Sequence, residues 1–296
     1  MRKVVFSLAA AIALAACNKD NVEMPGFEVR TSAQTYKVGD SVRFEFSGNP
    51  DNITFYSGEP GHNYEFRKRT RAANDLRIEF STLVRSGLIY PNLQLMVSGD
   101  FNGKATTADL AAATWTDISD RAVFSTGTDN TPSGIISLKE FSKGLHDTAR
   151  VYVAFRYTDY KKPQGQNLWA VRTFSATNLS DDGVVTPLAV MSTGGWQQVD
   201  VKNPVRVWTI TTAQLLMQNS SATVDDNEDW VISKGFDPRQ IAPDAGTALK
   251  NISTVLSRHS YVYTKPGTYK VVFEASAVRY NGEKRLTREI TLTITP

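Results

Sequence analysis

The amino-acid sequence predicts a protein built almost entirely from β-strands. Apolar and polar side chains alternate in residues 41–47, 76–80 and 290–294, and a period of two is typical of strands with one buried face. Turn-forming residues separate these segments, and helical patterns are confined to short stretches at residues 106–114 and 211–218. The predicted fold class is therefore all-β.

One strand pattern differs from the others. Residues 149–158 carry apolar side chains on both faces, with Val153 and Phe155 on one and Tyr152 and Ala154 on the other. A strand of this kind is covered on both sides, so we expect it at the centre of a sheet.

Two turns are predicted near the end of the chain. Residues 265–268 (KPGT) suit a type II turn in which Gly267 takes a positive φ. Asn281 and Gly282 stand between two strand-like segments, at residues 275–280 and 287–295, and predict a hairpin.

The first sixteen residues have the three parts of an export signal. Arg2 and Lys3 are basic, residues 4–14 are apolar, and small residues lead to Cys17. The apolar run is too short to span a bilayer core of about 30 Å. Residues 14–17 (LAAC) resemble the lipobox of bacterial lipoproteins, which implies a signal peptide at 1–16, a lipid on Cys17 that binds a membrane, and a tether at 17–26. A plain signal peptide with an incidental cysteine is the alternative.

The predicted cleavage changes how charge and cysteine content are interpreted. The formal net charge of +3 includes Arg2 and Lys3, and without them 31 basic side chains face 30 acidic ones. A nearly neutral chain argues against a nucleic-acid partner, because phosphate binding needs a concentrated basic surface. Since Cys17 is the only cysteine, the folded body is expected to contain no disulfide and no cysteine nucleophile.

The residues after Cys17 bear on location. Lys19 and Asp20 resemble the lipoprotein export signal of Bacteroides-type bacteria. This resemblance implies a lipid-anchored protein of the outer membrane, exposed at the cell surface. A protein facing the periplasm is the alternative.

The two ends of the chain resemble halves of one domain. Residues 36–44 (YKVGDSVRF) resemble the opening of a polycystic-kidney-disease-type, immunoglobulin-like domain, and residues 259–271 (HSYVYTKPGTYKV) resemble its closing signature. The resemblance implies one sandwich made from residues 27–71 and 251–296, interrupted by an inserted domain. Insertion at a surface loop costs little, because the ends of such a loop already lie close together. Two partial sheets, or two complete sandwiches in tandem, are the alternative.

The insert, residues 72–250, carries a second resemblance. Its motifs are similar to those of choice-of-anchor-J-like jelly-roll modules, and they occur at residues 97–103 (VSGDFNG), 113–118 (ATWTDI), 133–138 (SGIISL), 151–157 (VYVAFRY) and 168–169. The implied architecture is an immunoglobulin-like sandwich split in sequence by a jelly-roll β-sandwich. Taken together, the chain resembles an uncharacterised family of Bacteroides-type outer-membrane lipoproteins encoded beside starch-utilisation-type glycan-uptake systems.

The sequence gives little indication of catalysis. His62, His146 and His259 fit no metal-ligand spacing, and the local motifs of serine hydrolases, nucleotide-binding loops and zinc proteases are absent. Glycoside cleavage needs a pair of carboxylates, and nothing selects one among 30 acidic residues. We therefore predict that the protein is not an enzyme, with a divergent glycosidase as the less favoured hypothesis.

The densest acidic run lies at residues 225–229. Oxygen-rich loops can hold calcium, which makes Asp225, Asp226 and Asp229 candidate ligands of a structural ion. A solvated loop is the alternative, because the spacing matches no defined calcium loop.

Aromatic residues in loops are the candidates for ligand binding. Trp196 lies in a glycine-rich turn with amide neighbours, and Tyr160 lies in a polar loop. Sugar rings present apolar C–H faces that stack on aromatic rings, so both residues are candidate platforms, and loop anchors are the alternative. The remaining tryptophans are expected in the core: Trp115, Trp169, Trp208 and Trp230.

These observations and resemblances lead to one functional prediction and one alternative. We expect a non-catalytic surface lipoprotein that binds polysaccharide or oligosaccharide, with neighbouring glycan-uptake proteins as further partners. The alternative is a structural or adhesive lipoprotein that binds a protein partner. Exposure of Trp196 and Tyr160 on one concave face, with amide or carboxylate neighbours, would favour glycan binding. Burial of both, with the exposed aromatic residues forming a flat patch, would favour adhesion.

Overall fold

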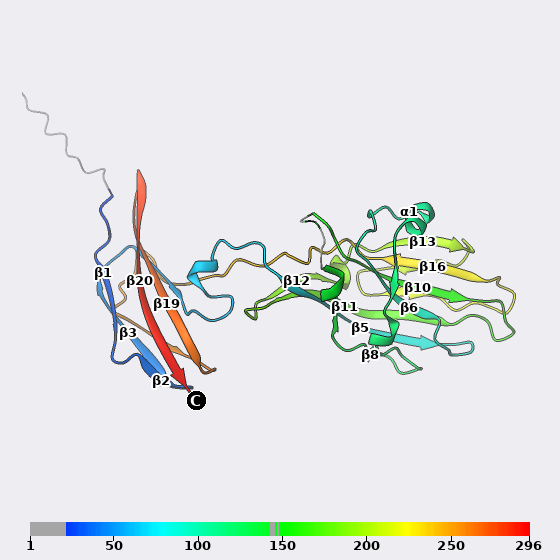
Figure 1. Cartoon of the computed structure of the whole chain (residues 1–296), viewed down its shortest axis with the longest axis horizontal. Coiled ribbons are helices and arrows are strands. Elements are labelled where there is room, and N and C mark those ends of the chain that lie inside the picture. Colours follow the sequence, from blue (N-terminus) through cyan, green and yellow to red (C-terminus); the bar gives the residue numbers. More distant parts are fainter. Residues whose placement is uncertain (1–21, 143–145, 147) are drawn as a thin grey trace, which may run out of the picture. The chain divides into compact units, whose positions relative to one another are not determined.

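The protein is nearly all β in the computed structural model, which describes residues 22–142, 146 and 148–296 (Figure 1). The predicted all-β fold class is confirmed. The predicted signal peptide and Cys17 lie outside the described residues. No helix in the described part of the chain is long and apolar enough to cross a membrane.

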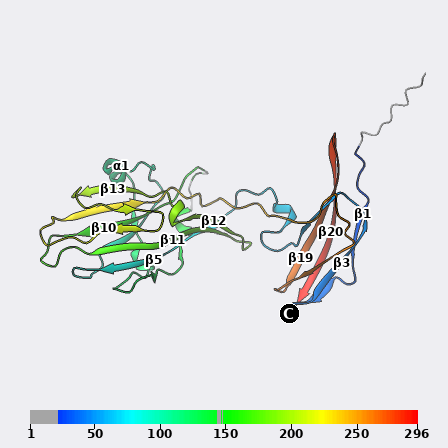
Figure 2. The ribbon, with the colours of Figure 1, turned by 180° about the vertical axis from the view of Figure 1, so that it is seen from behind.

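The chain divides into two compact units. The terminal unit combines the described residues up to Arg67 with Asp244–Pro296, and the central unit is Lys68–Pro243 (Figure 2). The assignment of these units to the immunoglobulin-like and jelly-roll classes stays a prediction.

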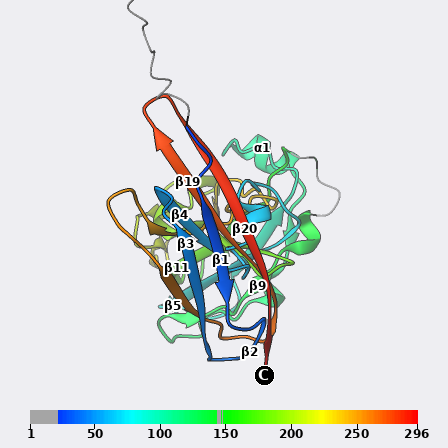
Figure 3. The same cartoon turned by 90° about the vertical axis from the view of Figure 1, so that its left-hand side faces the viewer.

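The terminal unit contains two sheets, and several of their strands are labelled in Figure 3. The β3 sheet has the order β1 (Phe27–Thr31), β3 (Ser41–Gly48), β18 (Arg258–Val262). The β19 sheet has the order β17 (Thr247–Lys250), β4 (Asn52–Tyr56), β19 (Gly267–Arg279), β20 (Gly282–Thr295), β2 (Thr35–Lys37). Strand β2 pairs with β20 in parallel, and the other described pairs of this unit are antiparallel. A short 3-10 helix, η1 (Tyr64–Phe66), follows β4.

The core of the terminal unit joins residues from both ends of the chain. Phe44 on β3 and Phe273 on β19 are fully buried, and their ring centroids lie 5.0 Å apart in an edge-on contact. Burial of such rings is a main source of folding free energy, so each segment depends on the other for its core.

The central unit also contains two sheets. The β10 sheet has the order β13 (Gln197–Lys202), β16 (Asn227–Ile232), β10 (Tyr152–Asp159), β6 (Leu93–Ser98), β7 (Thr116–Asp117). The β11 sheet has the order β14 (Thr209–Ile210), β15 (Leu215–Met217), β11 (Leu168–Ser180), β5 (Asn74–Arg85), β8 (Thr131–Pro132), with β12 (Val185–Val190) on β11 and β9 (Ile136–Ser137) on β5. Short helices connect the strands: α1 (Thr107–Ala112), η2 (Ser119–Arg121), η3 (Lys139–Ser142) and η4 (Met191–Thr193).

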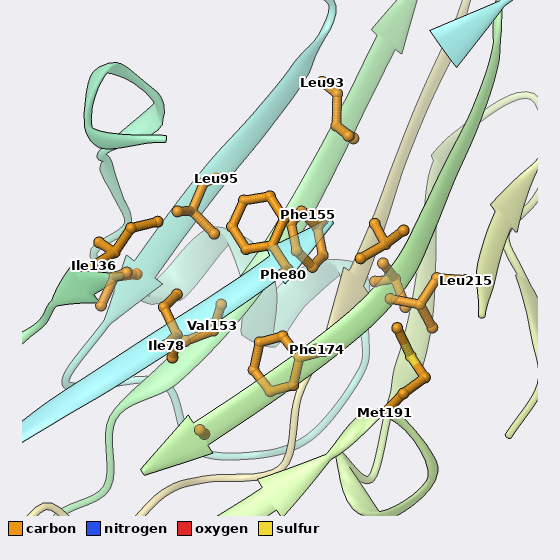
Figure 4. Close-up of a cluster of buried hydrophobic side chains, with 14 of the residues drawn as sticks. Ile78, Phe80, Leu93, Leu95, Ile136, Val153, Phe155, Phe174, Met191 and Leu215 are labelled. Carbon is orange, nitrogen blue, oxygen red and sulfur yellow. The ribbon is translucent and has the colours of Figure 1, made fainter. Parts of the chain in front are cut away.

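The two sheets of the central unit share one apolar core. Figure 4 shows Phe80 of β5 beside Phe155 of β10, and their ring centroids lie 5.0 Å apart. A second cluster covers the outer face of the β10 sheet, where Ala154 and Trp230 pack with Leu110 of α1. Strand β10 is therefore the middle strand of its sheet and is buried on both faces, which confirms the prediction for residues 149–158.

One of the two predicted helices is confirmed and the other is wrong. Helix α1 forms, and Thr106 caps it by accepting a hydrogen bond from the Asp109 amide at 3.1 Å. Residues 211–218 instead make a turn closed by Thr211 and then strand β15. The threonine hydroxyl competes for backbone amides, and burial of alternate side chains in the core favours a strand there.

The two predicted turns also differ in outcome. The hairpin between β19 and β20 is present, but its turn is formed by Tyr280 and Asn281, because Gly282 already pairs with Arg279. Gly267 does not take a positive φ, so the predicted type II turn is wrong. Pairing of Gly267 with Ile294 keeps its backbone extended as the first residue of β19.

Candidate functional site

Two neighbouring hollows lie in the central unit, and Tyr90 lines both. The first, called here the polar groove, has a volume of about 330 Å³ and is lined by Tyr90, Thr158, Asp159, Tyr160, Lys202, Asp226, Asn227 and Glu228. The second, called the apolar pocket, has a volume of about 410 Å³ and is lined by Ile89, Tyr90, Pro91, Leu93, Phe124, Ser125, Thr126 and Trp169. Both volumes are within the range of small-ligand sites.

A buried carboxylate at the end of β10 organises this region. Asp159 is the last residue of β10 and is almost completely buried. One of its oxygens accepts hydrogen bonds from the Tyr90 hydroxyl at 2.5 Å and the Tyr160 amide at 2.8 Å. The other accepts from the Asn92 side chain, the Tyr157 hydroxyl and the Asn167 amide, at 3.2, 3.1 and 3.1 Å. A carboxylate with this many donors is a fixed anchor for the loops around it.

Lys162 supplies the positive charge that balances Asp159. Its side chain is buried and forms an ion pair with Asp159. Its Nζ also lies 4.6 Å from the ring centroid of Tyr90 and 4.7 Å from that of Tyr160. Cations are attracted to aromatic faces at these distances, so the lysine holds both tyrosine rings in place.

The tyrosine shared by the two hollows is neutral and fixed. Burial, reinforced by the hydrogen bond to Asp159, raises the pKa of Tyr90 far above its usual value, so its hydroxyl remains a donor at neutral pH. On the side of the apolar pocket, Trp169 Nε1 donates to Asn92 Oδ1 at 2.7 Å. The walls of both hollows are thus tied to the same polar network.

The rim of the polar groove carries ionised groups. The Lys161 amide and the Lys202 ammonium hydrogen-bond to Asp226, at 2.9 and 3.1 Å, and hold the pKa of this carboxyl below its usual value. Glu228 Oε1 accepts from Arg156 Nε and Trp230 Nε1, at 2.9 and 3.1 Å. Carboxylates and an ammonium beside an aromatic ring can bind the hydroxyl groups of a ring-shaped polar ligand.

The structure brings only one of the two predicted aromatic platforms to this site. Tyr160 lies in the polar groove, and 50% of its surface is exposed. Its ring centroid is 6.0 Å from that of Tyr90.

Trp196 does not join the site. It is half-buried, its ring packs 4.9 Å from that of Phe174, and its Nε1 donates to the Met191 carbonyl at 3.1 Å. Trp196 precedes the end of β13 that pairs with Ile232, whereas the groove residue Lys202 pairs with Glu228 at the other end. The turn was expected to expose the ring, but the surrounding apolar side chains cover it. Of the other tryptophans, Trp169, Trp208 and Trp230 are buried as predicted, and Trp115 is half-buried against the outer cluster.

The acidic run 225–229 does not form one cation site. Asp225 forms an ion pair with Lys161, and Asp226 forms one with Lys202. Asp229, in contrast, is buried inside the unit on β16. Successive side chains of β16, which starts at Asn227, point to opposite faces, and the odd-numbered ones point into the unit. In the part of the chain that the structure describes, no group of three or more His, Cys, Asp or Glu side chains is arranged to hold a metal ion.

Sequence reasoning missed Tyr90 and the apolar pocket. The available signal was the run Leu88 to Pro91, in which apolar residues occupy a loop between two strands and Leu88 and Ile89 are exposed. Exposed apolar residues in a loop often line a binding site.

One family model matches the chain. It is described as "Domain of unknown function (DUF5017)" and matches residues 16–196. The match includes Tyr90, Asp159, Tyr160 and Lys162, and it ends before Lys202 and the acidic rim. The comparison with curated proteins gives no match.

Proposed function

Given that the chain belongs to the DUF5017 family of domains of unknown function, we propose that it is a non-catalytic, lipid-anchored protein that binds glycan in the polar groove. The observation that carries the proposal is the setting of Tyr160. Its half-exposed ring is backed by the buried Lys162 ammonium and stands beside the charged rim of Asp226, Lys202 and Glu228.

The physical argument rests on the two kinds of surface that a sugar presents. The C–H face of a pyranose ring stacks on an aromatic face, and its hydroxyl groups need donors and acceptors at the edge. Tyr160 offers the first surface and the ionised rim offers the second. Because Asp159 and Lys162 restrict both tyrosine rings, little conformational entropy is lost when a ligand binds.

The hydrogen bonds of Asp159 support a binding role for this region. Both of its oxygens accept hydrogen bonds from protein donors, so this carboxylate positions Tyr90 and Tyr160 for a ligand.

The proposed location follows from the sequence. A lipid on Cys17 would hold the protein at the outer membrane, and Lys19 and Asp20 favour the cell surface. A protein placed there would retain polysaccharide or oligosaccharide for neighbouring proteins of a starch-utilisation-type uptake system. Binding of a protein partner by an adhesive lipoprotein stays the alternative.

The proposal is tested by affinity electrophoresis of the purified chain through gels that contain each member of a polysaccharide panel. We expect at least one polysaccharide to retard the chain, and Tyr160→Ala to abolish the retardation. Tyr280→Ala is the matched control, since Tyr280 is 86% exposed on the hairpin of the terminal unit and lies outside the groove. Retardation by no polysaccharide would contradict glycan binding, and retardation that survives Tyr160→Ala would contradict the assignment to the polar groove.

A further inference from the structure

Six side-chain oxygen atoms in the described part of the central unit are buried without a hydrogen-bond partner. Two belong to Asn74 and Asn178, and the other four lie on β13 and β16: Oδ1 and Oδ2 of Asp229, Oδ1 of Asn227 and Oδ1 of Asp200. Asp229 has 0% and Asn227 has 2% of its surface exposed. Buried polar atoms in native proteins almost always have a hydrogen-bond partner. Four unpaired oxygens on two paired strands therefore indicate a ligand that the protein itself does not supply.

The strand register places these oxygens together. Asp200 of β13 and Asp229 of β16 are directly opposite in the antiparallel pair. Asn227 lies two residues before Asp229 on the same strand, so its side chain points to the same face. The three side chains therefore occupy one patch on the inner face of the β13–β16 pair, which we call the orphan-oxygen cluster.

The orphan-oxygen cluster has no ion-pair partner among the described residues. Neither Asp229 nor Asp200 forms an ion pair there, while the neighbouring Glu228 is paired with Arg156. Arg206 accepts a hydrogen bond from the Asn227 side-chain amide with its backbone carbonyl, at 3.2 Å, and its own Nε is buried without a partner. Burial, reinforced by the negative charge of Asp200 and opposed by the Asn227 side-chain amide, raises the pKa of Asp229 to about 8.

A buried carboxylate has three ways to avoid the cost of an unpaired charge: protonation, pairing with a cationic side chain, or binding of a metal ion. Protonation of Asp229 supplies a single O–H donor, which can satisfy at most one of the Asp200 and Asn227 oxygens. Two carboxylates and an amide oxygen form a hard, oxygen-only ligand set with two negative charges, which suits a calcium ion.

We propose that Asp229, Asp200 and Asn227 bind a calcium ion that ties β13 to β16. The cluster supplies four oxygens, and water or backbone carbonyls complete the six to eight ligands that calcium takes. The site contains two carboxylates and one amide, and it uses neither Asp225 nor Asp226. Since Asn227 also lines the polar groove, the ion lies next to the proposed glycan site, but the inference does not depend on glycan binding.

The test uses the purified full chain, stripped with EDTA and then supplied with calcium chloride. We expect one calcium per chain by plasma mass spectrometry after dialysis, and a melting temperature that rises on calcium addition and falls again with EDTA. Asp229→Asn is expected to remove the bound calcium and the calcium-dependent rise. Above pH 8, where Asp229 is ionised, this variant should melt no lower than the stripped wild type, because it removes an unpaired buried charge while keeping the side-chain shape.

Two further variants keep the test decisive. Asp200→Asn, which alters a less buried residue, is expected to weaken calcium binding by about tenfold or more and serves if Asp229→Asn does not fold. Asp225→Asn, at an exposed carboxylate, is expected to bind calcium as the wild type does. Absence of bound calcium together with a melting temperature insensitive to calcium would overturn the proposal. So would calcium binding that survives both Asp229→Asn and Asp200→Asn.

Discussion

The hydroxyl of Tyr90 donates a hydrogen bond of 2.5 Å to the carboxylate of Asp159, which is itself buried and paired with Lys162. Tyr90 forms part of the wall of both the polar groove and the apolar pocket. A change at this one contact should therefore alter the stability of the region and the ligand site together.

Removal of the Tyr90 hydroxyl tests the strength of that contact. Tyr90→Phe keeps the ring but leaves Asp159 with one donor fewer. Hydrogen bonds to charged groups contribute about 1.5–3 kcal/mol, so we expect the free energy of unfolding to fall by about 2 kcal/mol. Chemical denaturation measures the change. A Tyr90→Phe variant as stable as the wild type would contradict the role assigned to the bond.

Removal of the Lys162 charge should be more damaging. Lys162→Met retains most of the apolar stem but leaves the Asp159 carboxylate buried without a counter-charge. Breaking a buried pair from one side typically costs about 3–5 kcal/mol. Asp159→Asn combined with Lys162→Met should be more stable than Lys162→Met alone, since the remaining charge is also removed. A double variant no more stable than the single variant would show that packing, not charge, dominates at this position.

The core shared by the two terminal segments gives a third prediction. Phe273→Ala removes a fully buried ring that contacts Phe44, and such truncations cost about 3–5 kcal/mol. We expect this loss in the unfolding of the terminal unit, followed by circular dichroism. Val255→Ala, at a side chain that is almost fully exposed, should change stability by less than about 0.5 kcal/mol.

The raised pKa of Asp229 predicts a pH effect in calcium-free buffer. The pKa of Asp229 is about 8 in the folded chain against a reference of 3.8, so between these values the folded state binds a proton that the unfolded state does not. The contribution of Asp229 is therefore fully present below about pH 3.8 and is lost as the pH rises towards 8. The slope is about 1.4 kcal/mol per pH unit.

Subtraction isolates this effect from that of other carboxyl groups. The unfolding free energies of the wild type and Asp229→Asn are measured in EDTA at pH 5 and pH 8. Relative to the wild type, Asp229→Asn should be more stable at pH 8 than at pH 5. At pH 8, calcium should stabilise the wild type and so reduce this relative gain of Asp229→Asn. An identical difference at both pH values in EDTA would contradict the raised pKa.

Local patterns account for the parts of the molecule that the sequence predicts well. The alternation of Val42, Phe44 and Phe46 and the cap at Thr106 depend on neighbours within a few residues, so they can be recognised without knowledge of the fold. The same holds for the two apolar faces of β10, whose central position follows from side chains that are consecutive in sequence.

The site depends on contacts that are distant in sequence. Trp196 was placed in an exposed turn by its glycine neighbours, but Phe155 and Phe174 from other strands cover its ring. Tyr90 and Asp159 meet only because β6 and β10 are adjacent. Likewise, Asp229 is buried and Asp225 and Asp226 are not, because β16 begins at Asn227. The acidic run in the sequence does not indicate where this strand begins.

The construction of the terminal unit from both ends of the chain has a consequence for the order of folding. Strands β18, β19 and β20 follow the whole central unit in sequence, whereas β1 to β4 precede it. During synthesis or export, the apolar faces of the early strands stay uncovered until the final segment is released. By then the central unit already has all of its strands. The central unit is thus free to fold first, and the pairing of β19 and β20 with the earlier strands completes the terminal unit last.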